Sequence, residues 1–269
     1  MVANSTMLVQ NLTAQHLDDI MVNHLLVNGV TDKFIIENVL NYPRSLFLQN
    51  DLKSMGNSDG CVYYQKNKFL IEISTLAYMI MASKMPHEKN VLVIGSGVGY
   101  ASTILANIYN SVIGIEEEQG LTEKATLMAN KVKLKNLTFV KSNLLLEPMP
   151  KALATQSLMP VINEGVLAQD LPLLDSNQGL FLAQEYELKN IFKDNSFDLI
   201  FVEGAYSYIP PRWLEVLTAE GNIIGVQRKD NLSQIVKSQK LGNGLVHTYY
   251  KNVATPLLKG LELKKEFIF

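Results

Sequence analysis

The chain has 269 residues, of which 47% are hydrophobic and 19% charged, and its formal net charge is −2. This length accommodates one large α/β domain or two small ones, and it buries enough surface to be stable without disulfides. The near-neutral charge argues against a protein that coats nucleic acid, which would carry a basic excess. Cys61 is the single cysteine and the four histidines are scattered, so we expect no disulfide and no metal site.

The sequence also gives expectations about membranes and compartment. It contains no apolar run of about 18 residues, the length that a membrane-spanning helix needs. Its first residues have neither the basic start nor the apolar core of a signal peptide. We therefore expect a soluble cytoplasmic protein that uses neither a membrane nor a nucleic acid as partner.

The first part of the chain, residues 1–86, has a helical pattern. Apolar residues recur at helical spacing in two runs between residues 13 and 48, with Thr31 or Asp32 as the cap of the second helix and Pro43 as its end. Residues 50–68 are polar and contain glycine, which favours an irregular segment. A long apolar helix is expected over residues 72–84. We expect this region to form an N-terminal helical extension that lines the substrate side.

From residue 87 to the C-terminus, strand-like runs alternate with helical ones. This alternation predicts parallel strands with right-handed crossovers, and therefore an α/β fold with a Rossmann-like sheet flanked by helices. Residues 217–221 are expected to be a helix end followed by a glycine turn. The expected strands are residues 91–94, 111–116, 137–141, 197–203 and 221–227, and the clearest helices are 100–108 and 119–134.

Residues 144–195 interrupt this alternation. They separate the third and fourth strands by far more than one crossover helix requires. The segment contains four prolines and many leucines, and it is too apolar for a disordered linker. We interpret it as an insertion packed on the domain surface, with a lid or an oligomer contact as the alternative.

A glycine-rich turn after the first of these strands is the strongest chemical signal. Glycines at such a turn allow a ligand to approach the backbone closely, and the helix that follows directs its N-terminal amides at the ligand. The spacing G-x-G-x-G differs from the dinucleotide fingerprint G-x-G-x-x-G, and no Gly-Lys-Ser/Thr follows as in a phosphate-binding loop. It resembles motif I of the S-adenosylmethionine-dependent methyltransferases. The candidate cofactor-binding residues here are Gly95, Ser96, Gly97, Gly99 and Tyr100.

Polar side chains follow the neighbouring strands. Glu116 ends the second strand, where a carboxylate can accept both hydroxyls of a ribose, and Glu117 is the alternative if the assignment slips by one residue. Asn143 follows the third strand, either as a partner of the adenine edge or as an ordinary turn residue. Glu203 lies in the sequence FDLIFVEGA, which resembles the fourth-strand motif of the same superfamily and implies a carboxylate that faces the cofactor.

The flanking segments resemble the protein-L-isoaspartate O-methyltransferase family. Residues 28–32 and 42–48 are similar to its N-terminal region, and residues 69–79 resemble the segment before motif I in a bacterial branch. The resemblance covers nearly the whole chain except residues 144–195. It implies S-adenosyl-L-methionine as cofactor, residues 87–269 as the domain that binds it, and a protein or peptide carboxylate as substrate.

Two departures from the family pattern affect the expected activity. The family's Gln-Thr-Ile-Ser run, which lines the acceptor pocket, has no counterpart near residues 69–72, and Val93 stands where motif I normally has an acidic residue. Glu72 and Ser74 are the remaining pocket candidates for the catalytic side. We expect little or no activity on isoaspartyl peptides, because a carboxylate pocket without donors leaves the incoming charge unpaired.

The sequence leaves three functional hypotheses. Carboxyl O-methyl transfer, as in protein repair, is favoured because an acceptor carboxylate is already ionised at pH 7 and needs no general base. A catalytically silent methyltransferase-like protein that binds a partner is the alternative. A nicotinamide-dependent oxidoreductase is disfavoured by the glycine spacing.

Overall fold

The computed structural model describes residues 19–83, 85–146 and 191–263. Most of the predicted insertion, residues 147–190, lies outside these ranges, as do the residues before 19 and the last six. None of the helices in the described ranges has the length and apolar character needed to span a bilayer. Within the same ranges, no group of three or more histidine, cysteine or acidic side chains is placed to hold a metal ion.

The N-terminal region is helical, as expected, but it also contains a hairpin. Asp32 caps the second main helix by accepting the backbone N–H groups of Phe34 and Ile35. The prediction of an irregular segment over residues 50–68 is wrong for its second half. The elements are η2 (Ile20–Leu25), η3 (Leu26–Asn28), α2 (Lys33–Asn41), η4 (Arg44–Leu46), η5 (Lys53–Asn57), β1 (Val62–Gln65), β2 (Lys68–Leu70) and α3 (Ile73–Ala82).

The hairpin forms because its alternate side chains are buried although most of its residues are polar. In β1, Val62 is buried while Tyr63 is exposed, which is the alternation of a half-covered strand, and Leu70, which pairs with Val62, is buried as well. Asn67 adopts a positive φ of 60° at the turn, a conformation that asparagine tolerates better than most residues. The polar composition of residues 50–68 therefore does not predict the pair of antiparallel strands that the structure contains.

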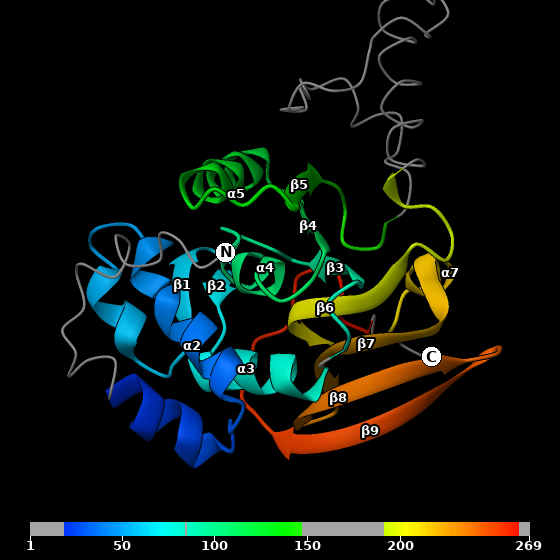
Figure 1. The fold of residues 1–269 in the computed structure, drawn as a ribbon. Coiled ribbons are helices and arrows are strands. Elements are labelled where there is room, and N and C mark those ends of the chain that lie inside the picture. Colours follow the sequence, from blue (N-terminus) through cyan, green and yellow to red (C-terminus); the bar gives the residue numbers. More distant parts are fainter. Residues whose placement is uncertain (1–18, 84, 147–190, 264–269) are drawn as a thin grey trace, which may run out of the picture.

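The remainder of the chain builds one sheet of seven strands flanked by helices (Figure 1). This is the predicted α/β Rossmann-like architecture with an N-terminal helical extension. The elements are β3 (Asn90–Ile94), α4 (Tyr100–Ala106), β4 (Ser111–Glu116), α5 (Gln119–Lys131), β5 (Leu137–Lys141), β6 (Phe197–Tyr206), α7 (Pro211–Val216), β7 (Leu217–Lys229), β8 (Leu232–Leu241) and β9 (Gly244–Asn252).

The strand order is β5-β4-β3-β6-β7-β8-β9. The first five strands are parallel, and the long strands β8 and β9 add antiparallel pairs at one edge. The chain order reverses between β3 and β6, and in open α/β sheets this switch point is where ligands bind outside the carboxyl ends of the strands. The topology therefore places the ends of β3, β4 and β6 at one site.

One predicted boundary in the sheet is wrong. Residues 217–221 are strand and not a helix end, because α7 stops at Val216 and Leu217 already pairs with Phe197 of β6. Leu217 is fully buried, and this burial favours the extended pairing over another helical turn.

The N-terminal elements lie beside α4, at one side of the sheet, where they are coloured blue to cyan in Figure 1. Arg44 holds this region together from the inside. Its guanidinium is 1% exposed and donates to the backbone carbonyls of Gly56, Ser58, Gly60 and Ile71. Since a buried arginine has five N–H donors, these carbonyls satisfy most of them and fix the loop that leads into the hairpin.

Candidate cofactor and acceptor site

A cavity of about 430 Å³ lies at the switch point of the sheet. It is bounded by the turns that follow β3 and β4, by β6, by the β1–β2 hairpin and by a C-terminal segment. Five of the predicted cofactor-binding residues line it: Gly95, Gly97, Glu116, Glu117 and Glu203. Four residues that the sequence did not predict for the site also line it: Tyr64, Lys68, Leu144 and Leu258.

The glycine turn after β3 uses left-handed backbone conformations. Gly95 has a φ of 73° and Gly97 a φ of 51°. A Cβ at Gly97 would overlap the hydroxyl of Tyr64, so the hairpin approaches this turn as closely as glycine allows. The backbone of Val98 hydrogen-bonds to the same hydroxyl. Tyr64 therefore closes the glycine turn from the hairpin side.

Three other predicted residues of this turn do not line the cavity. The side chain of Ser96 is fully buried, and Tyr100 packs edge-on against Phe47 with ring centroids 5.2 Å apart. A Cβ at Gly99 would stand 2.7 Å from the ring of Phe139. Gly99 and Tyr100 pack the start of α4 against its neighbours. Contact of all three residues with a cofactor stays a prediction.

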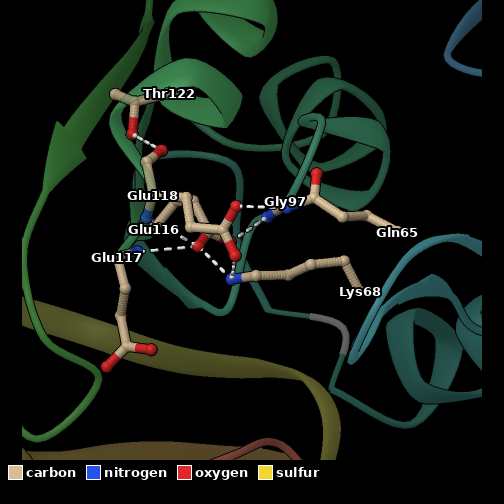
Figure 2. A network of polar contacts seen from close by, with 7 residues as sticks. All are labelled: Gln65, Lys68, Gly97, Glu116, Glu117, Glu118 and Thr122. Atoms are coloured by element: carbon tan, nitrogen blue, oxygen red, sulfur yellow. Dashed lines mark hydrogen bonds and ion pairs between the residues drawn. The ribbon is translucent and has the colours of Figure 1, made fainter.

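Glu116 is the centre of a polar network at the end of β4 (Figure 2). Its carboxylate is 1% exposed. The backbone N–H of Gly97 donates to Oε2 at 3.1 Å, and the N–H groups of Glu117 and Glu118 donate to Oε1 at 2.7 and 3.0 Å. The ammonium of Lys68 forms an ion pair with Oε1. Glu116 thus links the two turns that a nucleotide would contact.

The neighbouring carboxylates have different surroundings. Figure 2 shows the Glu117 carboxylate pointing away from that of Glu116. Burial raises the pKa of Glu117 although Lys68 opposes the shift. Glu118 accepts a hydrogen bond from the side-chain amide of Gln65, and its carboxylate lies 3.7 Å from the ammonium of Lys68. The geometry therefore favours Glu116 over Glu117 as the carboxylate that is held in place by backbone donors.

Glu203 lies on β6, directly after the last residue that pairs with β3. The strand register shifts between Phe201 and Ala205, so Glu203 sits in an irregular stretch of β6. The prediction that this strand ends at residue 203 is too short, because β6 continues to Tyr206.

The Glu203 side chain is buried and incompletely hydrogen-bonded. It is 2% exposed and accepts a hydrogen bond from the backbone of Ala101, whereas its Oε2 atom has no partner among the described residues. Burial, and to a smaller extent the charge of Glu116, raises the pKa of Glu203 well above its usual range. A buried polar atom without a partner at the wall of a cavity indicates a ligand contact.

Glu72, Ser74 and Asn143 are not among the residues that line the cavity. The Glu72 carboxylate accepts hydrogen bonds from Cys61 Sγ at 3.2 Å and Thr255 Oγ1 at 3.1 Å. Burial of the Cys61 thiol, together with the negative charge of Glu72, raises the pKa of Cys61 to about 12. Ser74 is buried near the start of α3, where its backbone N–H donates to Asp59. Their roles in an acceptor pocket, and that of Asn143 toward adenine, stay predictions.

The first half of the chain resembles a known family in sequence. Residues 16–144 match the family model described as Protein-L-isoaspartate(D-aspartate) O-methyltransferase (PCMT). A Protein-L-isoaspartate O-methyltransferase of Saccharophagus degradans is 32% identical over 130 residues, which are 48% of this chain and 58% of the relative. Protein-L-isoaspartate O-methyltransferase 1 of Geotalea uraniireducens is 29% identical over 118 residues, 44% of this chain and 53% of the relative. The chain thus spans a little over half the length of these curated relatives.

The solved structures extend the likeness in fold to most of the chain. A beta-aspartate methyltransferase (PCMT) from Plasmodium falciparum, in complex with S-adenosyl-L-homocysteine, superposes with a TM-score of 0.62 over 91% of this chain and 97% of its own, at 17% identity. A second protein-L-isoaspartate O-methyltransferase superposes with a TM-score of 0.63 over 92% of this chain and 66% of its own, also at 17% identity. At this identity the superpositions show the shared fold. In sequence, the likeness to the protein-L-isoaspartate O-methyltransferases lies in residues 16–144, a little under half of the chain.

Proposed function

We propose that this protein binds S-adenosyl-L-methionine in the cavity at the switch point and methylates a carboxylate of a protein or peptide. The observation that carries the proposal is the convergence of the Gly95–Gly97 turn, Glu116 and Glu203 on one cavity. The match of residues 16–144 to the protein-L-isoaspartate O-methyltransferase model supports the same activity.

The residues present fit this cofactor. The backbone at Gly97 leaves no room for a side chain, and the buried Glu116 carboxylate lies at the end of β4. Glu203 Oε2 lacks a partner within the part of the chain that the structure describes. Glu116 would accept ribose hydroxyls, and Glu203 would contact a polar part of the ligand. The bound cofactor supplies a methyl group that is already electrophilic on its sulfonium.

The protein has correspondingly little chemistry to perform. An acceptor carboxylate is ionised at pH 7, so it attacks without a general base. Among the described residues that line the cavity there is no histidine. The task of the site is then to align the two reactants and to exclude water. The hairpin residue Tyr64 and the C-terminal residue Leu258 close the cavity on two sides and fit this role.

The division of the chain belongs to the same proposal. Residues 1–86 would cover the acceptor side, and residues 87–269, with the insertion near 144–195, would hold the cofactor. The position of the β1–β2 hairpin at the cavity wall supports this division.

A thermal-shift series tests cofactor binding. S-adenosylmethionine, S-adenosylhomocysteine and NAD are each added to the full chain. A ligand present at about 100 times its dissociation constant stabilises the fold by roughly 2.7 kcal/mol. We expect stabilisation by the first two ligands only. Stabilisation by NAD alone would contradict the proposal and support an oxidoreductase.

Radiolabelled methyl transfer tests the acceptor. An isoaspartyl peptide is compared with its normal aspartyl twin, which has the same composition and charge. Turnover of the isoaspartyl form alone would establish the activity that gives the family its name. Binding of S-adenosylhomocysteine without transfer to either peptide would favour the catalytically silent alternative.

One observation favours that alternative. Phe69, Leu70 and Ile71 are all buried, so the segment that replaces the family's hydroxyl-bearing run offers no polar side chain to an acceptor. A protein of this kind would bind a partner and the cofactor but transfer no methyl group.

A further inference from the structure

The ion pair between Lys68 and Glu116 lies inside the cavity proposed for the cofactor. Lys68 begins strand β2 of the hairpin, and Glu116 ends strand β4 of the sheet, so the pair joins two parts of the chain that are 48 residues apart. The side chain of Lys68 is 17% exposed and that of Glu116 is 1% exposed. Figure 2 shows the lysine reaching across to the carboxylate.

The carboxylate of Glu116 has little capacity left for another ligand. A carboxylate offers about four lone-pair sites, two on each oxygen. Oε1 already receives Lys68 and the backbone N–H groups of Glu117 and Glu118, and Oε2 receives the N–H of Gly97. Oε2 keeps one open site, which can accept one ribose hydroxyl. A ribose that binds Glu116 through both hydroxyls must therefore replace an existing donor, and the crowded atom is Oε1.

Lys68 is the donor that can leave. The three backbone N–H groups belong to turns whose conformation the sheet fixes, whereas the ammonium is carried on a flexible four-carbon stem. Of the three lysines that line the cavity within the described ranges, Lys66 and Lys259 are exposed and only Lys68 is largely buried. A cofactor that takes Glu116 thus frees a positive charge within the cavity.

A freed and largely buried ammonium needs a new partner, because an unpaired charge away from water is costly. Glu118 is near, with Oε1 3.7 Å from the ammonium, but its carboxylate is 43% exposed and is also bonded to Gln65. The acceptor carboxylate that the proposed function brings to the same cavity is the alternative partner. It would supply a full negative charge where the segment of residues 69–71 supplies no donor for it.

We propose that Lys68 is an exchanging cation, and this inference rests on the proposed function. In the free protein Lys68 neutralises Glu116. When the cofactor occupies Glu116, the ammonium turns to the acceptor carboxylate and holds it in the cavity. Lys68 is therefore a specificity-determining residue, and it makes the binding of cofactor and acceptor mutually favourable.

Calorimetric binding to the full chain tests this inference without requiring turnover. The affinity for an isoaspartyl peptide is measured with and without saturating S-adenosylhomocysteine, and the affinity for S-adenosylhomocysteine is measured with and without the peptide. In the unsubstituted protein we expect each ligand to strengthen the other by the same factor, at least about tenfold, because coupling between sites is reciprocal. A peptide whose isoaspartyl carboxylate is replaced by an amide should show no coupling.

Substitution isolates the contribution of Lys68. In Lys68→Met and Lys68→Gln we expect unchanged or tighter binding of S-adenosylhomocysteine, because the competing ammonium is gone, and less than about twofold coupling to the peptide. Two different substitutions are used so that a loss of coupling cannot be attributed to misfolding of one variant. Glu116 keeps its three backbone donors in both. Lys135→Met removes one charge from an exposed lysine outside the cavity and should retain the full coupling.

Three results would overturn the inference. Equal coupling with and without Lys68 would mean that the ammonium moves to Glu118 or stays in place. A tenfold loss of S-adenosylhomocysteine affinity in both Lys68 variants would show that the pair supports the cofactor site and does not compete with it. Failure of the unsubstituted protein to bind S-adenosylhomocysteine would refute the proposed function itself, and the exchange with it.

Discussion

The closest approach of the hairpin to the glycine turn can be tested at Gly97. Substitution by alanine places a Cβ at a residue with a φ of 51°, where an L-residue costs roughly 1–2 kcal/mol. The same Cβ would overlap the hydroxyl of Tyr64, while the ring carbon Cζ would be 3.5 Å away, an ordinary contact. The hydroxyl must therefore move and give up its hydrogen bond with the backbone of Val98. A lost hydrogen bond of this kind adds about 1 kcal/mol.

Together these contributions amount to about 2–3 kcal/mol of lost unfolding free energy for Gly97→Ala. In a Tyr64→Phe background the hydroxyl is absent, so only the backbone strain of roughly 1–2 kcal/mol remains. A double-mutant cycle, with unfolding free energies from urea titrations, then gives a coupling of about 1 kcal/mol between the two positions.

The cost of Gly97→Ala is compared between the protein with Tyr64 and the protein with Tyr64→Phe. Equal destabilisation by Gly97→Ala with and without the Tyr64 hydroxyl would refute the contact between hairpin and glycine turn. A cost near zero in both backgrounds would in addition refute the left-handed conformation of Gly97. The single variant Tyr64→Phe measures the hydrogen bond to Val98 and serves as the reference.

Three further predictions follow from the described contacts. Glu116→Ala should weaken S-adenosylhomocysteine binding about tenfold to hundredfold in calorimetry, because hydrogen bonds to a charged group contribute roughly 1.5–3 kcal/mol, and a larger loss in Glu117→Ala would move the assignment by one residue. Glu203→Gln should raise the melting temperature relative to the unsubstituted protein, and the difference should grow as the pH rises above about 4.5. A carboxyl whose pKa is raised by folding stabilises the protein below its unfolded pKa, and this stabilisation is lost as the pH rises toward the folded pKa. A difference in melting temperature that stays constant across pH would contradict the burial of this carboxyl. Arg44→Met should cost at least about 3 kcal/mol in chemical denaturation, because it leaves buried carbonyls such as that of Ile71 without a donor, and a smaller loss would show that water satisfies them.

The framework of the sheet can be predicted from local patterns in the chain. The strands predicted at residues 111–116 and 137–141 are β4 and β5 with the same bounds, since each is a short apolar run between turn residues. The Gly95–Gly97 turn and Glu116 could be placed at strand ends for the same reason. These features depend on residues that are close along the chain, and hydrophobic periodicity and turn chemistry report on such neighbours.

Other predictions failed or were absent because the deciding partner lies far away in the sequence. The start of β7 at Leu217 depends on pairing with Phe197, and the hairpin near residues 62–70 depends on burying Val62 and Leu70 in the hydrophobic core. A polar composition does not predict such a hairpin, because strand formation there depends on packing against the rest of the core.

In the candidate site, too, some features are predicted by local sequence and others depend on tertiary contacts. The glycine spacing and the position of Glu116 at the end of a strand predicted a nucleotide-binding edge from the sequence alone. Only the tertiary structure brings Tyr64 to Gly97 and Lys68 to Glu116, because the hairpin carrying both side chains reaches the sheet from a separate part of the chain. It also leaves Glu203 Oε2 buried with no partner in residues 19–83, 85–146 and 191–263. An ion pair between residues 48 apart, or an oxygen without a donor, is a property of packing in three dimensions, and no local pattern in the sequence encodes it.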